Sequence, residues 1–115
     1  MTVDKDLLLM LKSSGLGEGE PDLSEKLLKA FLNMLLESGR IPARIICMNS
    51  AVFLTTEGSP VEEIMRKYEQ AGVEILSCLT CLDYYDRKEK LIVGQPTNMR
   101  DTVAALHSFP RVFSF

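Results

Sequence analysis

Short apolar runs alternate with longer segments of helical periodicity along the whole chain, and this alternation restricts the fold more than any other feature. Runs of this length that are apolar throughout are typical of strands buried on both faces of a sheet. The strands are expected at 6–11, 44–48, 73–78, 91–93 and 111–115, and the helices at 22–39, 60–72, 80–87 and 98–107. This order predicts an α/β fold of three layers, α/β/α, around a mainly parallel five-stranded sheet. The 115 residues fit a single domain, 1–115.

Charge and hydropathy exclude several classes of partner. The chain has 13 basic and 16 acidic residues, a net charge of −3, and no basic run, so we expect no nucleic acid and no membrane surface as partner. The apolar run 7–11 near the start is too short for a membrane span or a secretion signal. We therefore expect a cytoplasmic protein, in which three cysteines do not form a disulfide framework.

Two cysteines, Cys78 and Cys81, stand where the third expected strand passes into a helix. A helix N-terminus stabilises a thiolate, and two cysteines within one turn can bridge each other and resolve a persulfide. The alternative is a pair of small buried apolar side chains. A closed zinc site needs four ligands, and only Cys47, expected to be buried mid-strand, and His107 remain. We expect no metal and no cofactor.

Three loops are expected to meet at the carboxyl edge of the sheet, where open parallel sheets collect their ligands. They are 13–20, 49–59 and 78–81. The glycine-rich first loop lacks the Lys-Ser/Thr ending of a phosphate-binding loop. The alternative for the second loop is a simple turn and helix cap. The candidate substrate-binding residues on these loops are Gly17, Glu18, Asn49, Thr55, Thr56 and Glu57.

Several segments resemble a known family, the DsrE-like domain at the carboxyl end of YedF-type proteins associated with selenium metabolism. The segments are 16–19 (LGEG), 48–52 (MNSAV), 54–59 (LTTEGS), 76–85 (LSCLTCLDYY) and 93–99 (VGQPTNM). They are spread over most of the chain, and the segments at 54–59 and 76–85 are the specific ones. The resemblance implies a three-layer α/β fold and homo- or hetero-oligomers.

In some members of the wider DsrE/TusD-like family, a cysteine after a Gly-Val-Glu-Leu-x-x-Cys strand carries persulfide sulfur between proteins. The segment 72–78 (GVEILSC) matches this pattern and places Cys78 at the carrier position. Cys81 is additional to that pattern but is expected of the YedF-like group. Leu79 and Ala51 stand where the family is expected to have glycine. A TusA-like domain usually precedes this domain and is not among these residues, which leaves two alternatives: the chain acts alone, or it acts with separate donor and acceptor proteins, of which a TusA-like protein is one candidate.

The hypothesis from the sequence is a sulfurtransferase-like carrier of persulfide sulfur or selenium. Cys78 attacks a donor and holds the chalcogen for an acceptor protein, and Cys81 releases it by forming a disulfide with Cys78. The alternatives are a non-catalytic assembly module that binds a small ligand or partner, and a thiol redox sensor. We also expect a homo-oligomer, because the end of the chain is rich in apolar residues, namely Phe109, Val112, Phe113 and Phe115.

Overall fold

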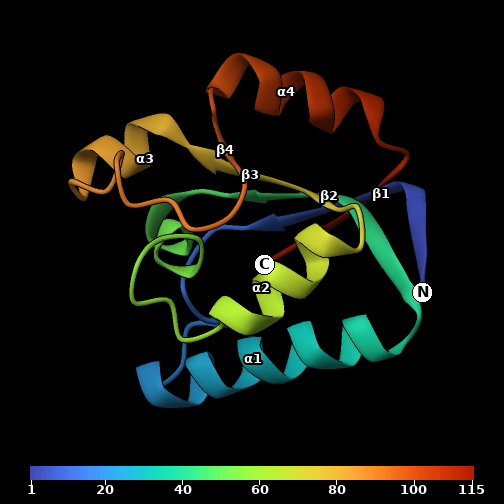
Figure 1. Cartoon of the computed structure of the whole chain (residues 1–115), viewed down its shortest axis with the longest axis horizontal. Helices are drawn as coiled ribbons and strands as arrows, with labels where there is room; N and C mark the ends of the chain where they lie inside the picture. The colour runs from blue at the N-terminus through green and yellow to red at the C-terminus, as the bar shows by residue number, and fades with distance from the viewer.

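The computed structural model describes residues 1–115 and has helices on both faces of one five-stranded sheet (Figure 1). The strands are β1 (Thr2–Leu11), β2 (Arg40–Cys47), β3 (Glu74–Cys78), β4 (Gln95–Thr97) and β5 (Arg111–Ser114). The helices are α1 (Pro21–Glu37), the 3₁₀ helix η1 (Asn49–Leu54), α2 (Glu62–Gln70), α3 (Leu79–Tyr84) and α4 (Met99–Ser108). The strand order is β4-β3-β2-β1-β5, and all neighbouring strands are parallel. The predicted fold class is confirmed.

The two faces of the sheet are covered unequally. Side chains alternate between the faces of a strand, so Leu9 and Leu11 of β1 face α1 and α2, whereas Leu8 and Met10 face α4. The first pair belongs to a core cluster of 17 buried residues and the second pair to a cluster of four. Figure 1 shows the same asymmetry, with α1 and α2 below the sheet and α4 above it. No helix of the chain has both the length and the hydrophobicity needed to cross a lipid bilayer.

The predicted fourth strand at 91–93 is wrong, because β4 is formed by residues 95–97 instead. The apolar run packs beside the 49–59 loop: the Ile92 N–H donates to the Thr55 carbonyl (2.9 Å), and Val93 joins the core. Gly94 then turns the chain with a φ of 73°, a left-handed conformation that glycine adopts easily. The next three residues pair with β3 through their backbone, which needs no apolar side chains.

Other boundaries differ because paired backbone extends into polar sequence. β1 and β2 begin four residues earlier than predicted, and their added ends pair with each other, Thr2 opposite Arg40. The segment 49–59, predicted as a polar loop, contains η1, whose residues Ala51, Val52 and Leu54 are buried. A search for apolar runs detects neither the added strand ends nor η1, because strand pairing and 3₁₀ turns are formed by backbone hydrogen bonds.

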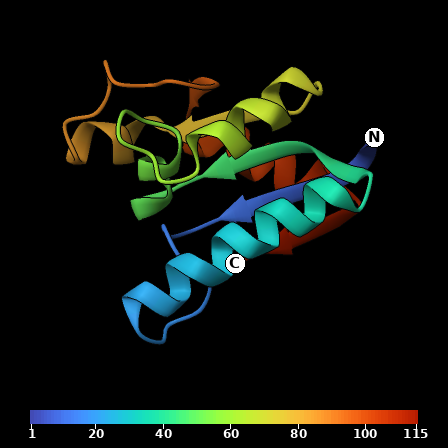
Figure 2. The ribbon, with the colours of Figure 1, turned by 60° about the horizontal axis from the view of Figure 1, so that its bottom comes forward.

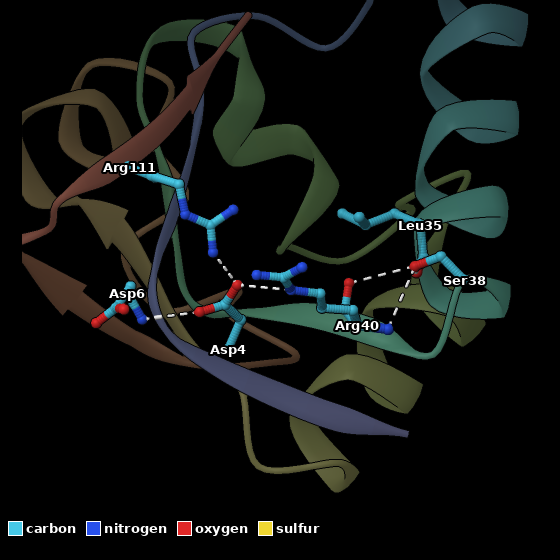
Figure 3. A network of polar contacts seen from close by, with 6 residues as sticks. All are labelled: Asp4, Asp6, Leu35, Ser38, Arg40 and Arg111. Carbon is cyan, nitrogen blue, oxygen red and sulfur yellow. Dashed lines mark hydrogen bonds and ion pairs between the residues drawn. The ribbon is translucent and has the colours of Figure 1, made fainter.

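A polar network ties together three strands at the amino-terminal end of the sheet (Figure 3). The Asp4 carboxylate of β1 accepts from the Arg40 Nε of β2 at 2.9 Å and from the Arg111 guanidinium of β5. It also accepts from the backbone N–H of Asp6 at 3.0 Å. These contacts anchor β5, the last strand of the chain, to the middle of the sheet.

Acid is expected to weaken the fold through Asp4. The Asp6 N–H and the two arginines hold the pKa of the Asp4 carboxyl below its usual value. A lowered pKa means that the stabilisation is complete above the unfolded-state value of about 4 and disappears as the pH falls through the folded-state value. In urea unfolding between neutral and acidic pH, Asp4→Asn should lower the stability near neutrality, and the difference from the wild type should shrink below about pH 4. A difference that stays constant with pH would contradict this assignment.

Candidate functional site

The two cysteines of the pair lie at a direct junction between strand and helix. Cys78 is the last residue of β3, and Cys81 is in the first turn of α3, with no loop between the two elements. Cys78 is buried, with 8% of its surface exposed, whereas Cys81 is half-buried. The two thiols are close enough for Cys78 to raise the pKa of Cys81. The exposed member of the pair is therefore Cys81, although the sequence favoured Cys78 as the reacting residue.

A backbone donor from the neighbouring strand reaches the Cys81 sulfur. The N–H of Asn49, just beyond the end of β2, donates to Sγ of Cys81 at 3.1 Å. Asn49 has a φ of 53°, in the left-handed region, where asparagine is enriched among non-glycine residues. A fixed N–H aimed at a sulfur favours negative charge on that sulfur. Asn49 therefore contributes to the site through its backbone.

Opposing effects act on the Cys81 thiol. Burial raises its pKa above the ordinary value, and the neighbouring Cys78 thiol raises the pKa further. The Asn49 N–H lowers the pKa but does not outweigh burial. At neutral pH Cys81 is therefore mainly a thiol, and its reactivity should increase as the pH rises.

An open pocket of about 410 Å³ gives access to Cys81. Its lining residues are Asn49, Thr80, Cys81, Tyr84 and Tyr85. The Tyr84 side chain is 83% exposed at the rim. Tyr85 packs on Phe53 of η1 with ring centroids 4.6 Å apart, and the Arg87 guanidinium lies 4.5 Å from the Phe53 ring centroid. This stack fixes one wall of the pocket.

Three candidate residues of the 49–59 loop, Thr55, Thr56 and Glu57, are not among the residues that line the pocket. Thr55 and Thr56 are fully buried, and their hydroxyls bond inside the protein: Thr55 to Ser77 at 2.7 Å, and Thr56 to the Val52 carbonyl at 2.9 Å. The Arg87 guanidinium donates to the Thr56 hydroxyl at 3.2 Å and to the backbone carbonyl of Glu57 at 2.9 Å. Glu57 itself is exposed. These contacts position the pocket wall. Substrate binding by Thr55, Thr56 or Glu57 stays a prediction.

The glycine-rich loop is folded onto the start of α1. Ser24 of α1 donates from its hydroxyl to the Gly17 carbonyl at 3.2 Å, and a Cβ on Gly15 would lie 2.7 Å from the Ser24 Cβ. Gly17 and Glu18 are exposed and are not among the residues that line the Cys81 pocket. Their role in binding a substrate also stays a prediction.

The third cysteine, Cys47, lies on the opposite face of the sheet from Cys78. Cys47 of β2 is fully buried in the larger core, as predicted, and burial raises its pKa to about 12. Its strand neighbour is Ser77, which precedes Cys78 and therefore faces the opposite side of the sheet from it. No three His, Cys, Asp or Glu side chains are grouped so that they could hold a metal ion.

Two features of this site are not predicted by the sequence. Asn49 is predicted as a substrate-binding residue, but not as a backbone donor to sulfur. The stack of Arg87 on Phe53 is not predicted at all. Neither feature has a sequence signature, because one depends on a single backbone angle and the other joins residues from different elements.

Comparison with known proteins supports the fold. No family model matches the chain, and no curated protein sequence is similar to it. Among solved structures, the ychN protein from E. coli superposes with a TM-score of 0.69 at 18% identity, covering 97% of this chain and 100% of its own. MTH1491 from Methanobacterium thermoautotrophicum, a protein of unknown function, gives 0.72 at 10% identity, with coverage of 97% and 100%. BT1422 from Bacteroides thetaiotaomicron, also of unknown function, gives 0.65 at 18% identity, with coverage of 96% and 95%.

These likenesses extend over nearly the whole chain, but their sequence identity is low. They establish the architecture, a parallel five-stranded sheet flanked by helices, and they carry no activity across. The protein therefore has the DsrE-like α/β fold that it shares with the ychN protein.

Proposed function

We propose that the Cys78–Cys81 pair is a carrier of sulfane sulfur. The observation that carries the proposal is the arrangement at Cys81. A half-buried thiol faces an open pocket, a fixed N–H points at its sulfur, and a second, buried thiol lies three residues away at the end of β3, close enough to affect its pKa. A sulfur relay needs an accessible nucleophile, stabilisation of charge on the sulfur, and a thiol that can resolve the product.

Cys81 receives the sulfur in this proposal, because Cys78 is the less accessible thiol. The Cys81 thiolate attacks the terminal sulfur of a donor persulfide, R–S–SH. The bond between the two donor sulfurs breaks, the donor leaves as R–S⁻, and Cys81 becomes Cys–S–SH. Attack on that terminal sulfur by an acceptor thiolate passes it on and restores the Cys81 thiolate. The Asn49 N–H stabilises charge on Sγ before loading and after transfer.

Cys78 acts on a cysteine persulfide that meets no acceptor. Its thiolate attacks Sγ of Cys81, the Cys78–Cys81 disulfide forms, and hydrosulfide leaves. A dithiol reductant then returns both cysteines to thiols and is itself oxidised to a disulfide. Cys78 thereby limits the lifetime of the loaded state.

The partners are a donor and an acceptor protein, and the surface near Cys81 suits contact with a protein. Leu79 and Tyr84 of α3 are apolar or aromatic and exposed beside the pocket. The resemblance to YedF-type proteins favours a TusA-like protein as one partner, and it extends the cargo to selenium, which forms the same bonds. Carriers of this kind need reduced thiols, so we place the activity in the cytoplasm.

A second candidate is a binding module with no covalent step. The pocket favours it, because two tyrosines and a threonine hydroxyl can bind a small ligand without any use of sulfur. The two cysteines distinguish the two functions. Conversion of both to serine should abolish sulfur transfer, but it should leave ligand binding by a binding module unchanged.

Loading is expected when the reduced protein is incubated with a cysteine desulfurase and cysteine. Intact-mass spectrometry should show the addition of one sulfur atom, and peptide mapping should place it on the peptide that contains Cys78 and Cys81. The matched control is Cys47→Ser, which should load like the wild type because Cys47 is buried away from the pair. No added sulfur, or equal loading of a Cys78→Ser/Cys81→Ser double variant, would favour the binding module.

A further inference from the structure

The strand β5 leaves one edge of the sheet open. β5 pairs only with β1, and Figure 2 shows it at the margin of the sheet beside α1. All of its residues are exposed. An unpaired strand edge is a template for another strand, and soluble proteins usually protect such edges with proline, with charge or with a very short strand.

The opposite edge of the sheet is protected and β5 is not. β4 has only three residues, and one of them is Pro96, which has no N–H to offer. β5 has four residues and no proline, and its one charged side chain, Arg111, is paired with Asp4. The two edges therefore differ in their capacity to add a strand.

The free backbone groups of β5 can be assigned from its bonds to β1. The Phe115 N–H donates to the Met10 carbonyl at 2.9 Å, and the Phe115 carbonyl accepts from the Lys12 N–H at 2.8 Å. Successive residues of a strand direct their backbone N–H and carbonyl groups to opposite edges of the strand. The backbone groups of Phe113 therefore also face β1, whereas those of Val112 and Ser114 face the open edge. The open edge thus presents two N–H groups and two carbonyls.

The side chains beside this edge are apolar. Val112 lies opposite Leu8 in the register and shares its face of the sheet, whereas Phe113, like its partner Leu9, lies on the α1 face. On the α1 face, Phe115 contacts Phe31 with ring centroids 4.8 Å apart. Three exposed apolar residues of α1 lie on the same side of the helix as Phe31, at spacings of three or four residues, namely Leu23, Leu27 and Met34. Exposed apolar side chains beside an unpaired strand edge are typical of a protein–protein interface.

We infer that β5 pairs with β5 of a second copy, antiparallel and across a twofold axis at Phe113. In this register, Val112 of each copy lies opposite Ser114 of the other, and each such pair exchanges two hydrogen bonds. All outward N–H and carbonyl groups of Val112 and Ser114 in both copies are then satisfied, and the two sheets become one sheet of ten strands. The two Phe113 side chains meet on the α1 face as a cross-strand aromatic pair. Arg111 lies opposite Phe115, so no like charges face each other.

The partner of β5 is a second copy of this chain, because the open edge of β5 is complementary to itself. A twofold interface must satisfy each group with its own symmetry mate, and this strand does so for every free backbone group. The proposal is independent of the cysteine chemistry, because β5 and the Cys81 pocket share no residues.

The test is the oligomeric state of charge variants at position 113. Light scattering at high micromolar concentration should report a dimer for the wild type. Phe113→Lys and Phe113→Glu should each be monomeric, because like charges then meet at the twofold axis, and an equimolar mixture should form a heterodimer. The control is Tyr84→Lys, a change of an exposed aromatic residue of α3, which should remain dimeric.

A second variant keeps the proposal testable if charge at position 113 disturbs folding. Ser114→Pro removes one outward N–H and leaves the inward bonds of Phe113 and Phe115 in place, so it should weaken dimerisation at an unchanged melting temperature of the monomer. A monomeric wild type, or a dimer that survives both Phe113→Lys and Ser114→Pro, would overturn the inference.

Discussion

Cys81→Ser is expected to abolish sulfur loading, whereas Cys78→Ser should load as fully as the wild type. Serine has no thiolate, and Cys78 is too buried to replace Cys81 as the group that meets a donor protein. In Cys78→Ser the persulfide should persist longer, because no neighbouring thiol can expel it as hydrosulfide. The initial rate should rise with pH beyond the ordinary cysteine pKa of about 8.5, since burial raises the pKa of Cys81.

Both variants are compared by intact-mass spectrometry after timed exposure to a desulfurase and cysteine, over a pH series. Serine is close to cysteine in size, so each variant should fold, and unchanged circular dichroism would confirm this. The opposite pattern, with loading lost in Cys78→Ser and kept in Cys81→Ser, would restore the order of events that the resemblance to the DsrE/TusD-like family implies. Loading that is kept in both variants would mean that the two thiols are interchangeable.

Gly94→Ala should destabilise the protein strongly. An added Cβ would overlap the carbonyl oxygen of Ile75 in β3 and lie 3.0 Å from the Ile75 Cβ. Backbone atoms in a sheet cannot move aside as a flexible side chain can, so β4 would separate from β3. The N–H of Gly94 also donates to the Glu69 carboxylate at 2.6 Å, a bond that the same displacement would break. The expected loss is about 3 kcal/mol or more.

A matched substitution separates this overlap from the cost of the backbone angle. Gly58 has a similar left-handed φ, 86° against 73°, and open space around its Cβ position. Gly58→Ala should therefore lose only about 1 kcal/mol, the intrinsic cost of that conformation. Urea unfolding of both variants measures the difference. Equal losses of unfolding free energy in Gly94→Ala and Gly58→Ala would show that the close approach of Gly94 to Ile75 adds nothing to the cost of the substitution.

The sequence predicts the parallel sheet well because the central strands are buried on both faces. The runs 7–11 and 45–47 are apolar and buried at every position, whereas an amphipathic helix such as α1 has polar residues at every turn. The fourth strand was misplaced for the same reason. Residues 91–93 have the apolar signature but pack beside a loop, whereas residues 95–97 form an edge strand through backbone pairing alone.

The candidate site was predicted in part. The position of the cysteine pair between strand and helix follows from the apolar run before Cys78, and the burial of Cys47 follows from its neighbours. The relative exposure of Cys78 and Cys81 could not be predicted, because it depends on α3 beginning immediately at Leu79. In this chain α3 follows β3 directly, and the last residue of the strand, Cys78, is the buried member of the pair.

The placement of Cys47 on the far face of the sheet from Cys78 has a practical consequence. A thiol in the middle of a core becomes accessible to a modifying reagent only when the sheet around it opens. Under conditions where closing is faster than chemical modification, the labelling rate of such a thiol reports the population of opened molecules. The chain thus contains its own unfolding reporter, which requires no added fluorophore and remains separate from the two cysteines that we assign to sulfur chemistry.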